Sequence, residues 1–404
     1  MIYLVRSADL KFLIAEQPGS VMQLFEHEAK EILAREGVLV PRSCYVSTAE
    51  QALESTARIG PPVVLKAQTL VKGRGKAGLV RLAYCPSEAA RVFEELVGRS
   101  HEGPSVSGVL IEEKIPLVGE IFLSITVDCP NASPLLLVGL QGGVEVETIL
   151  LDRPEFVKKV HFSPAKGLKE AQIFEVLDFV ANAMPEFFGV RTRKQLEKLI
   201  RVSEKIFKTY DCELLEINPL GIADDLSLVV IDALMVIDDD AEFRHPDLVR
   251  PRGQSQQDFQ REQEFKKKGW TFIPMGGEIG ILSSGAGITM AILDLIHLYG
   301  GKPANFLDTA QMDRRGIYEA FQIFHTNTNT KVLLVNIFAG LNRCDDLALG
   351  IVDYLRDFQP PFPIVVRMIG NKDEEGRRIL REHGLEPLVA LEEAVLKAIE
   401  KLRG

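Results

Sequence analysis

Short apolar runs alternate with stretches of helical periodicity throughout the last third of the chain. Five runs predict strands, each followed by a helical segment, and they span residues 279–283, 304–307, 332–338, 364–368 and 387–390. Because these strands are apolar on both faces, they predict a parallel sheet covered by helices on both sides, a doubly wound α/β arrangement. In such sheets, ligands bind at the carboxyl ends of the strands.

The preceding part of the chain mixes helices and strands less regularly. Apolar residues at helical spacing predict a first helix that begins at Met22 and ends before Gly37. The stretch 214–232 predicts two strands joined by a turn at Asn218-Pro219. The other elements predicted here are helices at 48–57 and 87–97, two helices within 166–208, and strands at 63–65, 109–112, 121–127 and 135–140.

A polar stretch separates the two parts. Residues 250–269 carry five glutamines and a run of three lysines, which indicates a domain boundary. We therefore expect an N-terminal extension at 1–21, a first domain at 22–253, a linker at 254–269 and a second domain at 270–404. A chain of 404 residues with 46% apolar composition is long enough for two or three separate cores.

Charge and cysteine content exclude several classes of protein. The net charge of −10 argues against a nucleic acid or an anionic membrane as a general partner. The five scattered cysteines form no Cys-x-x-Cys pair, so neither a disulfide framework nor a zinc site is expected. Arg6, Asp9 and Lys11 interrupt the apolar start of the chain, which is unlike a signal peptide, and no segment is long enough to span a bilayer. These features favour a cytoplasmic protein.

The stretch 214–232 holds a candidate metal site. Asn218 and Asp232 lie fourteen residues apart, where the prediction places them at the ends of adjacent strands. Mg²⁺ prefers one or two protein oxygens together with nucleotide phosphates and water, so this sparse pair suits Mg-nucleotide better than Ca²⁺. The alternative is an ordinary hairpin with no ligand.

A glycine-rich basic loop follows the strand at 63–65. Its glycines let the backbone approach a ligand, and its cations concentrate positive charge; they are Gly73, Gly75 and Gly78 with Lys66, Lys72, Arg74 and Lys76. A polyphosphate fits such a loop, although the spacing is not that of a Walker motif. A charged hairpin tip is the alternative.

Two acids flank the next turn. Glu112 and Glu120 bracket Pro116 and Gly119, where carboxylates at the edge of a cleft can accept hydrogen bonds from ribose hydroxyls or an adenine amino group. Each of them, taken singly, fits a solvated acid at a strand end better than a ligand contact.

The second domain offers an anion site at the first strand. Ser284, Gly285 and Gly287 join this strand to its helix, so the glycines expose a helix N-terminus whose free N–H groups favour a phosphoryl or carboxylate group. Gly340 and Asn342 follow the third strand and are expected at the same rim. The incomplete GxGxxG pattern makes a dinucleotide site a weaker rival.

The order of motifs resembles the β subunit of succinyl-CoA synthetase and related nucleoside-diphosphate-forming acyl-CoA ligases over nearly all of residues 22–402. The matching stretches are LFEHEAKEIL, VVLKAQ...GRGKAG, QGGVEVE, LLEINPL, DDDAEFRHPDL, GEIGIL..GAG, GGKPANFLD, VNIFAGLNRCD and VVRMIGN. The resemblance implies an ATP-grasp domain followed by a flavodoxin-like domain, with ATP or GTP, CoA, a small carboxylic acid and Mg²⁺ as ligands. It also implies an α subunit that carries the phosphorylated histidine and the CoA site, in an αβ or α2β2 assembly.

The resemblance assigns roles to individual residues. Lys66 and the run Gly73-Arg74-Gly75 match nucleotide-phosphate contacts, and Glu112 and Glu120 match adenosine contacts. Asn218 and Asp232 match Mg²⁺ ligands, while Glu216 matches a glutamate that steadies the phosphohistidine. Ser284, Gly285, Gly287, Gly340 and Asn342 fall in the loops that handle the acid and its phosphate. Arg74 and Glu216 are the candidate catalytic residues.

Several positions depart from the family pattern. Lys72 replaces a glycine or alanine, and its surroundings are closer to ATP citrate lyase; Gln141 replaces a glutamate. Ser284 stands for an asparagine that faces the substrate carboxylate, and Thr309-Ala-Gln311 replaces a glycine-rich stretch. The resemblance implies succinate as the acid, and these departures in the acid-handling loops leave two alternatives, a ligase for malate or citrate and a regulatory paralogue with weak catalysis.

Overall fold

The computed structural model describes residues 22–70, 73–98, 106–144, 146–252, 256–310, 312–325 and 329–403. The predicted extension at 1–21, Lys72 and Gln311 lie outside these residues. The chain divides into two compact units, residues 1–255 and 256–404, each taken by itself below. Among the described residues, no helix has the length and apolar composition that crossing a membrane would need.

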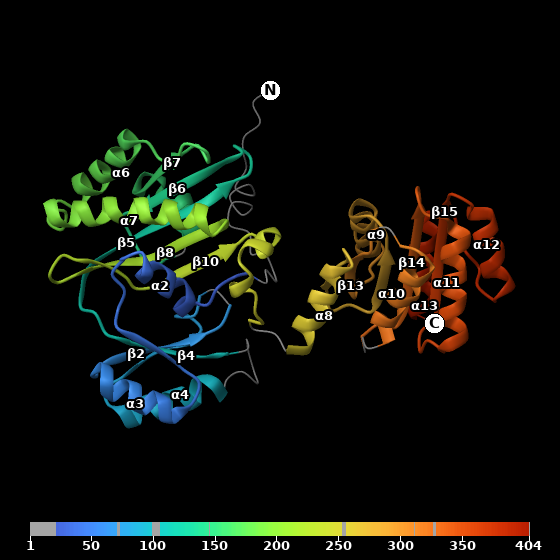
Figure 1. Cartoon of the computed structure of the whole chain (residues 1–404), viewed down its shortest axis with the longest axis horizontal. Helices are drawn as coiled ribbons and strands as arrows, with labels where there is room; N and C mark the ends of the chain where they lie inside the picture. Colours follow the sequence, from blue (N-terminus) through green and yellow to red (C-terminus); the bar gives the residue numbers. More distant parts are fainter. Residues whose placement is uncertain are drawn as a thin grey trace. The chain divides into compact units, whose positions relative to one another are not determined.

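The N-terminal unit contains two sheets (Figure 1). Its strands are β1 (Ser43–Val46), β2 (Val63–Gln68), β3 (Val80–Ala83), β4 (Gly108–Glu113), β5 (Leu117–Asp128), β6 (Ser133–Gly139), β7 (Val157–His161), β8 (Cys212–Ala223), β9 (Leu228–Val230) and β10 (Ala233–Ile237). The smaller sheet has the order β1-β4-β2-β3. The larger has the order β10-β8-β5-β6-β7, with β9 paired to β8.

Helices cover these sheets. They are α2 (Glu26–Arg35), α3 (Ala49–Ile59), α4 (Pro86–Gly98), α5 (Val146–Asp152), α6 (Glu170–Ala183) and α7 (Val190–Thr209), with 3₁₀ turns at Pro154–Phe156, Asp239–Arg244 and Pro246–Leu248. Helices α3 and α4 pack on the smaller sheet, while α7 lies against β5 and β8 of the larger one (Figure 1). The two predicted helices of 166–208 are thus confirmed as α6 and α7.

The first helix starts later than predicted. Residues 22–25 are extended and pair with β10, because Leu24 N–H donates to Met235 O and Ile237 N–H donates to Met22 O. Helix α2 begins at Glu26, where the carboxylate of Glu28 accepts the N–H of Phe25 at 2.8 Å. The apolar periodicity at 22–25 therefore belongs to a strand-like segment.

The predicted turn at Asn218-Pro219 is wrong. Strand β8 continues through both residues, with a bulge opposite β5, and the carbonyl of Pro219 accepts the N–H of Ile231 at 3.2 Å. A bulge tolerates proline because no ladder donor is needed there. The chain reverses instead at 224–227, where Asp225 Oδ1 accepts the N–H of Ser227.

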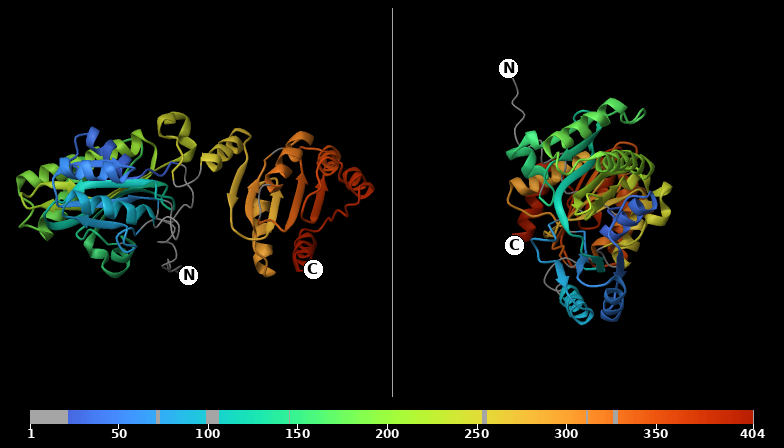
Figure 2. Two further views of the ribbon diagram at one scale, coloured as in Figure 1. Left: turned by 90° about the horizontal axis from the view of Figure 1, so that it is seen from below. Right: turned by 90° about the vertical axis from the view of Figure 1, so that its left-hand side faces the viewer.

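The C-terminal unit is a mostly parallel sheet with helices on both faces (Figure 2). Its strands are β11 (Thr271–Pro274), β12 (Ile279–Ser283), β13 (Asn305–Asp308), β14 (Val332–Ala339) and β15 (Ile364–Gly370). Its helices are α8 (Gln256–Lys267), α9 (Ala286–Leu298), α10 (Arg314–His325), α11 (Cys344–Asp357), α12 (Asp373–Glu382) and α13 (Leu391–Arg403). The order β11-β13-β12-β14-β15 gives the flavodoxin-like arrangement around a central β12.

Three details of this unit differ from the sequence prediction. Residues 387–390 form no strand but a single bridge between Arg367 and Leu388, in which Leu388 N–H donates to Val366 O and Met368 N–H donates to Leu388 O. The edge strand β11 was not predicted and runs antiparallel to β13. The stretch predicted as a linker, 254–269, contains α8, whose Phe265 packs with Trp270 in the core of this unit.

Candidate active site

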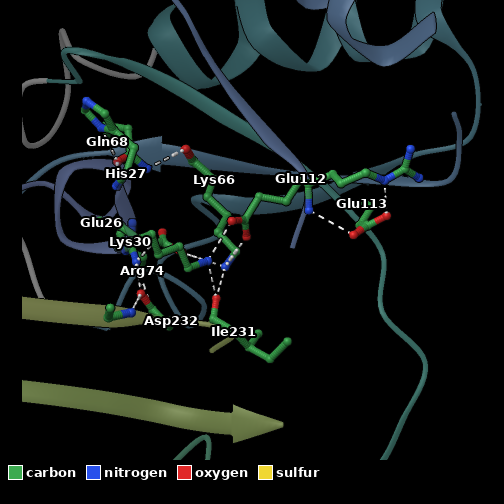
Figure 3. A network of polar contacts seen from close by, with 12 residues as sticks. Glu26, His27, Lys30, Lys66, Gln68, Arg74, Glu112, Glu113, Ile231 and Asp232 are labelled. Carbon is green, nitrogen blue, oxygen red and sulfur yellow. Dashed lines mark hydrogen bonds and ion pairs between the residues drawn. The ribbon is translucent and has the colours of Figure 1, made fainter. Parts of the chain in front are cut away.

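Two lysines and two glutamates of the N-terminal unit meet in one network of polar contacts (Figure 3). Lys66 on β2 places its Nζ 2.7 Å from Glu26 Oε1, 2.7 Å from Glu112 Oε2 and 2.5 Å from the carbonyl of Ile231. Lys30 on α2 places its Nζ 2.7 Å from Glu26 Oε1, 2.6 Å from Glu112 Oε1 and 2.6 Å from the same carbonyl. All four side chains are buried.

Arg74 joins this cluster to the candidate metal site. Its Nη2 lies 2.8 Å from Glu26 Oε2 and donates to Asp232 at 2.7 and 2.9 Å, while its Nη1 donates to the carbonyl of Ala67. The turn that carries Arg74 is closed by bonds from Ala77 N–H to Gly73 O and from Gly78 N–H to Gly75 O. Gly73 has a φ of +71°, a conformation that glycine adopts without strain.

The opposing charges shift the pKa values of Glu26 and Lys66 toward their ionised forms. Burial by itself would raise the pKa of Glu26, but Lys30, Lys66 and Arg74 outweigh it and hold that pKa well below the usual value. Burial would lower the pKa of Lys66, yet Glu26, Glu112 and Asp232 raise it. A buried network of paired charges results, in which removing one partner leaves another charge uncompensated.

A second group of predicted residues lies along β5 and β8. Asn218 Oδ1 accepts the N–H of Gly143 at 2.9 Å, and its Nδ2 donates to Glu216 Oε1 at 3.2 Å. The carbonyl of Glu120 accepts the N–H of Gly142 at 3.1 Å. Asn218 N–H donates to Asp232 O at 3.2 Å, so the strand pairing brings this group and the charged cluster together at the candidate metal ligands.

Glu112 differs from its prediction. It was expected as an acid at the edge of a cleft, but it lies within β4 with only 2% of its surface exposed, and both carboxylate oxygens face lysines. Sequence reasoning also missed Glu26 and Lys30. Their signal is a charged pair at i and i+4 on the same stripe of α2 as Ala29 and Leu33, where apolar residues are the rule.

The predicted residues of the C-terminal unit gather at the carboxyl ends of β12, β13 and β14. Gly285, with a φ of +97°, caps the exposed start of α9 and donates its N–H to Asp308 Oδ1 at 2.7 Å; Gly287 lies in the first turn of that helix. Ser284 before it is half-buried. Asn342, just after the exposed Gly340, donates to Met312 O at 2.5 Å.

Asp308 and Thr309 tie two of these loops together. Asp308 Oδ1 also accepts the N–H of Ala310 at 2.9 Å, and the hydroxyl of Thr309 donates to Ser283 O at 2.9 Å. An open groove of about 530 Å³ adjoins Met312 and Asn342 and is also lined by Trp270 and Arg315. Asp308 thus takes the N–H groups of Gly285 and Ala310, so a small anion would meet those of the first turn of α9, which have no acceptor within the helix.

Two family models match the chain along its length. Residues 23–222 match the ATP-grasp domain, and residues 282–400 match the CoA-ligase domain. A nucleotide-binding ATP-grasp unit followed by a doubly wound CoA-ligase unit defines the class, that of nucleoside-diphosphate-forming acyl-CoA ligases.

Curated relatives identify the family within this class. The β subunit of ADP-forming succinate–CoA ligase from Ignicoccus hospitalis is 37% identical over 380 residues, which cover 94% of this chain and 99% of that protein. The corresponding subunit from Desulfurococcus amylolyticus is 38% identical over 387 residues, covering 95% of this chain and all of that protein. The chain belongs to the family of succinate–CoA ligase β subunits.

A solved structure supports the fold. ATP citrate lyase from Methanothrix soehngenii, in complex with citrate and coenzyme A, superimposes with a TM-score of 0.67 over 94% of this chain and 99% of that chain. At 19% identity, this similarity concerns the fold alone.

Proposed function

We propose that this chain is the nucleotide-binding β subunit of an ADP-forming ligase that joins succinate to CoA. Besides the family, one observation carries the proposal: Lys66, Arg74 and Asp232 come from three separate segments and converge beside Asn218. Cations next to a pair of oxygen ligands are what a metal-bound triphosphate needs.

The reaction requires an activated acid, because a carboxylate does not react with a thiol at a useful rate. Transfer of a phosphoryl group from ATP through a histidine gives an acyl phosphate that the thiol can attack. In this chain, Arg74 would contact the nucleotide phosphates, Lys66 would add positive charge from the buried cluster behind Arg74, and the glycine turn around Gly73 and Gly75 lets the backbone approach the phosphates. Glu216 steadies the phosphohistidine.

Asn218 and Asp232 have the donor chemistry for Mg²⁺. Both offer hard oxygens, and the backbone bond from Asn218 N–H to Asp232 O holds Asp232, just before β10, beside β8. A bound Mg²⁺ would supply charge neutralisation at the phosphates. Among the residues described, no group of three or more His, Cys, Asp or Glu side chains forms a metal cage, which leaves a sparse site of this kind as the candidate.

The histidine and the CoA site belong to an α subunit under this proposal. None of the chain's seven histidines lies in a glycine-rich phosphate loop. Ser284, Gly285, Gly287, Gly340 and Asn342 would receive the acid and its phosphate at the exposed start of α9. We further propose an αβ or α2β2 assembly in the cytoplasm, where free cysteines such as the five of this chain persist.

The test is phosphate release by the complex of this chain with a co-expressed α subunit. With ATP, Mg²⁺ and CoA, succinate should support turnover, and malate, citrate and acetate should not; GTP is compared with ATP. Turnover with malate or citrate alone would move the specificity to that acid. Binding of Mg-ATP without turnover of any acid would indicate a regulatory paralogue.

The chain alone provides a second test. It should bind nucleotide but form no phosphoenzyme, because the nucleophile is on the partner. Incubation with labelled ATP and mapping of any phosphohistidine checks this, and label on one of its own histidines would contradict the partner's role.

A further inference from the structure

The two lysines of the buried cluster have no hydrogen-bond donor left for a ligand in this arrangement. An ammonium group has three N–H donors, and Lys66 faces three acceptors: Glu26, Glu112 and the carbonyl of Ile231. Lys30 faces the same three groups. Arg74 is different. Its Nη1 and Nη2 donate hydrogen bonds to Ala67 O and Asp232, its Nη2 also forms an ion pair with Glu26, and its Nε takes part in none of these contacts.

The two acidic partners of Arg74 differ in burial. The Glu26 side chain is 1% exposed, the Arg74 side chain 11% and the Asp232 side chain 37%. Replacing Glu26 would leave buried cations without a negative partner. Asp232 lies at the solvent boundary, where it can exchange Arg74 for another partner.

We propose that Glu26, backed by Lys30, is a positioning residue of the nucleotide site, and that Asp232 is the exchangeable partner of Arg74. Glu26 holds Arg74 and Lys66 from the buried side. Without metal, Asp232 competes with a phosphate for Arg74; once Asp232 serves a metal ion, Arg74 is released to the phosphate. This inference rests on the proposed function, and it couples metal and nucleotide binding through one guanidinium group.

The exchange predicts that removing the Asp232 carboxylate raises the affinity for ATP when no metal is present. In EDTA, Asp232→Ala should bind ATP on the order of tenfold more tightly than the wild type, because its Arg74 has lost a competing carboxylate. With Mg²⁺, the same variant should bind less tightly than the wild type. Isothermal titration calorimetry on the full-length chain measures both.

A matched control removes the same charge elsewhere. Asp225 pairs with Arg191 at 3.4 Å at the tip of the β8–β9 hairpin, away from the cluster, so Asp225→Ala should leave both affinities unchanged. If the ATP affinity of Asp232→Ala in EDTA is unchanged or weaker, the exchange is overturned. The proposed function still stands in that case if the wild type binds Mg-ATP. A wild-type chain that binds no Mg-ATP would overturn both.

The positioning role is tested with a charge-balanced double variant. Glu26→Gln with Lys30→Met removes one negative and one positive charge, so the remaining cluster stays neutral. ATP binding should weaken on the order of tenfold both with and without Mg²⁺, because Arg74 and Lys66 lose their shared anchor. The increase in ATP affinity on addition of Mg²⁺ should persist in this double variant, whereas Asp232→Ala should lose it.

The control pair lies on the same helix. Glu31 and Arg35 are 3.6 Å apart and mostly exposed, so Glu31→Gln with Arg35→Met should bind ATP as the wild type does. A Glu26/Lys30 variant that melts at a lower temperature yet keeps wild-type ATP affinity would overturn the positioning role and leave only a structural one.

Discussion

The two candidate sites of this chain handle charge in opposite ways. In the N-terminal unit, Lys30, Lys66, Glu26 and Glu112 are buried and neutralise one another. At the rim of the C-terminal sheet, the predicted residues are glycines, a serine and an asparagine around the exposed start of α9. Fixed charges are costly to bury and need partners, whereas exposed backbone N–H groups can meet an anion at little cost. The difference suits a metal-bound triphosphate at one site and a small acid or phosphoryl group at the other.

The largest effect is expected at the boundary between Asp232 and Arg74. Asp232→Ala should reduce Mg-ATP-dependent phosphorylation of the partner histidine by at least roughly a hundredfold, since it removes one of the two proposed metal ligands. Phosphohistidine formation in the αβ complex measures this, with Asp225→Ala as the control. Retained phosphorylation in a folded variant would show that Asp232 is not a metal ligand.

The buried cluster itself should dominate stability. Lys30→Met leaves Glu26 and Glu112 with one cation fewer in a buried setting, which should lower the free energy of unfolding by roughly 3–5 kcal/mol. Urea denaturation followed by circular dichroism measures the change. Arg35→Met on the exposed face of the same helix should stay within about 0.5 kcal/mol of the wild type, and equal effects from the two substitutions would contradict the comparison.

The rim should respond locally and weakly. Asp308→Ala removes the acceptor for the N–H groups of Gly285 and Ala310, at a cost of about 1–2 kcal/mol, and amide hydrogen exchange at these two residues should accelerate. The exposed Asp294 on α9 provides the control. Protection that survives Asp308→Ala would mean that the loop does not depend on this carboxylate.

The smallest expected effect is the contribution of Asp345, near the rim, to the pH dependence of stability. A hydrogen bond from Arg343 lowers the pKa of Asp345 to about 2. Because the pKa in the folded chain lies below the usual value of about 3.9, this bond stabilises the fold at neutral pH and its contribution is lost as the pH falls from about 4 to about 2. NMR titration of the Asp345 carboxylate measures the midpoint, which Arg343→Gln should raise; an unchanged midpoint would exclude Arg343 as the cause.

Much of the architecture is readable from the sequence because it depends on local patterns. Strands apolar on both faces, alternating with helices, predicted β12 to β15 and their covering helices. The predictions failed where tertiary pairing overrode local signals. Residues 22–25 pair with β10 despite helical spacing, and Asn218-Pro219 sits in a bulge of β8 instead of a turn.

The candidate site divides in the same way. By itself, the sequence identified three short motifs, because each has its own chemistry. They are the glycine-rich turn with Arg74, the pair Asn218 and Asp232, and the glycines at the start of α9. Only the tertiary structure decided that Glu26 and Lys30 join them, and that Glu112 faces lysines rather than a cleft. Long-range contacts choose the partners of a buried charge, because such a charge is stable only where the fold brings it an opposite one.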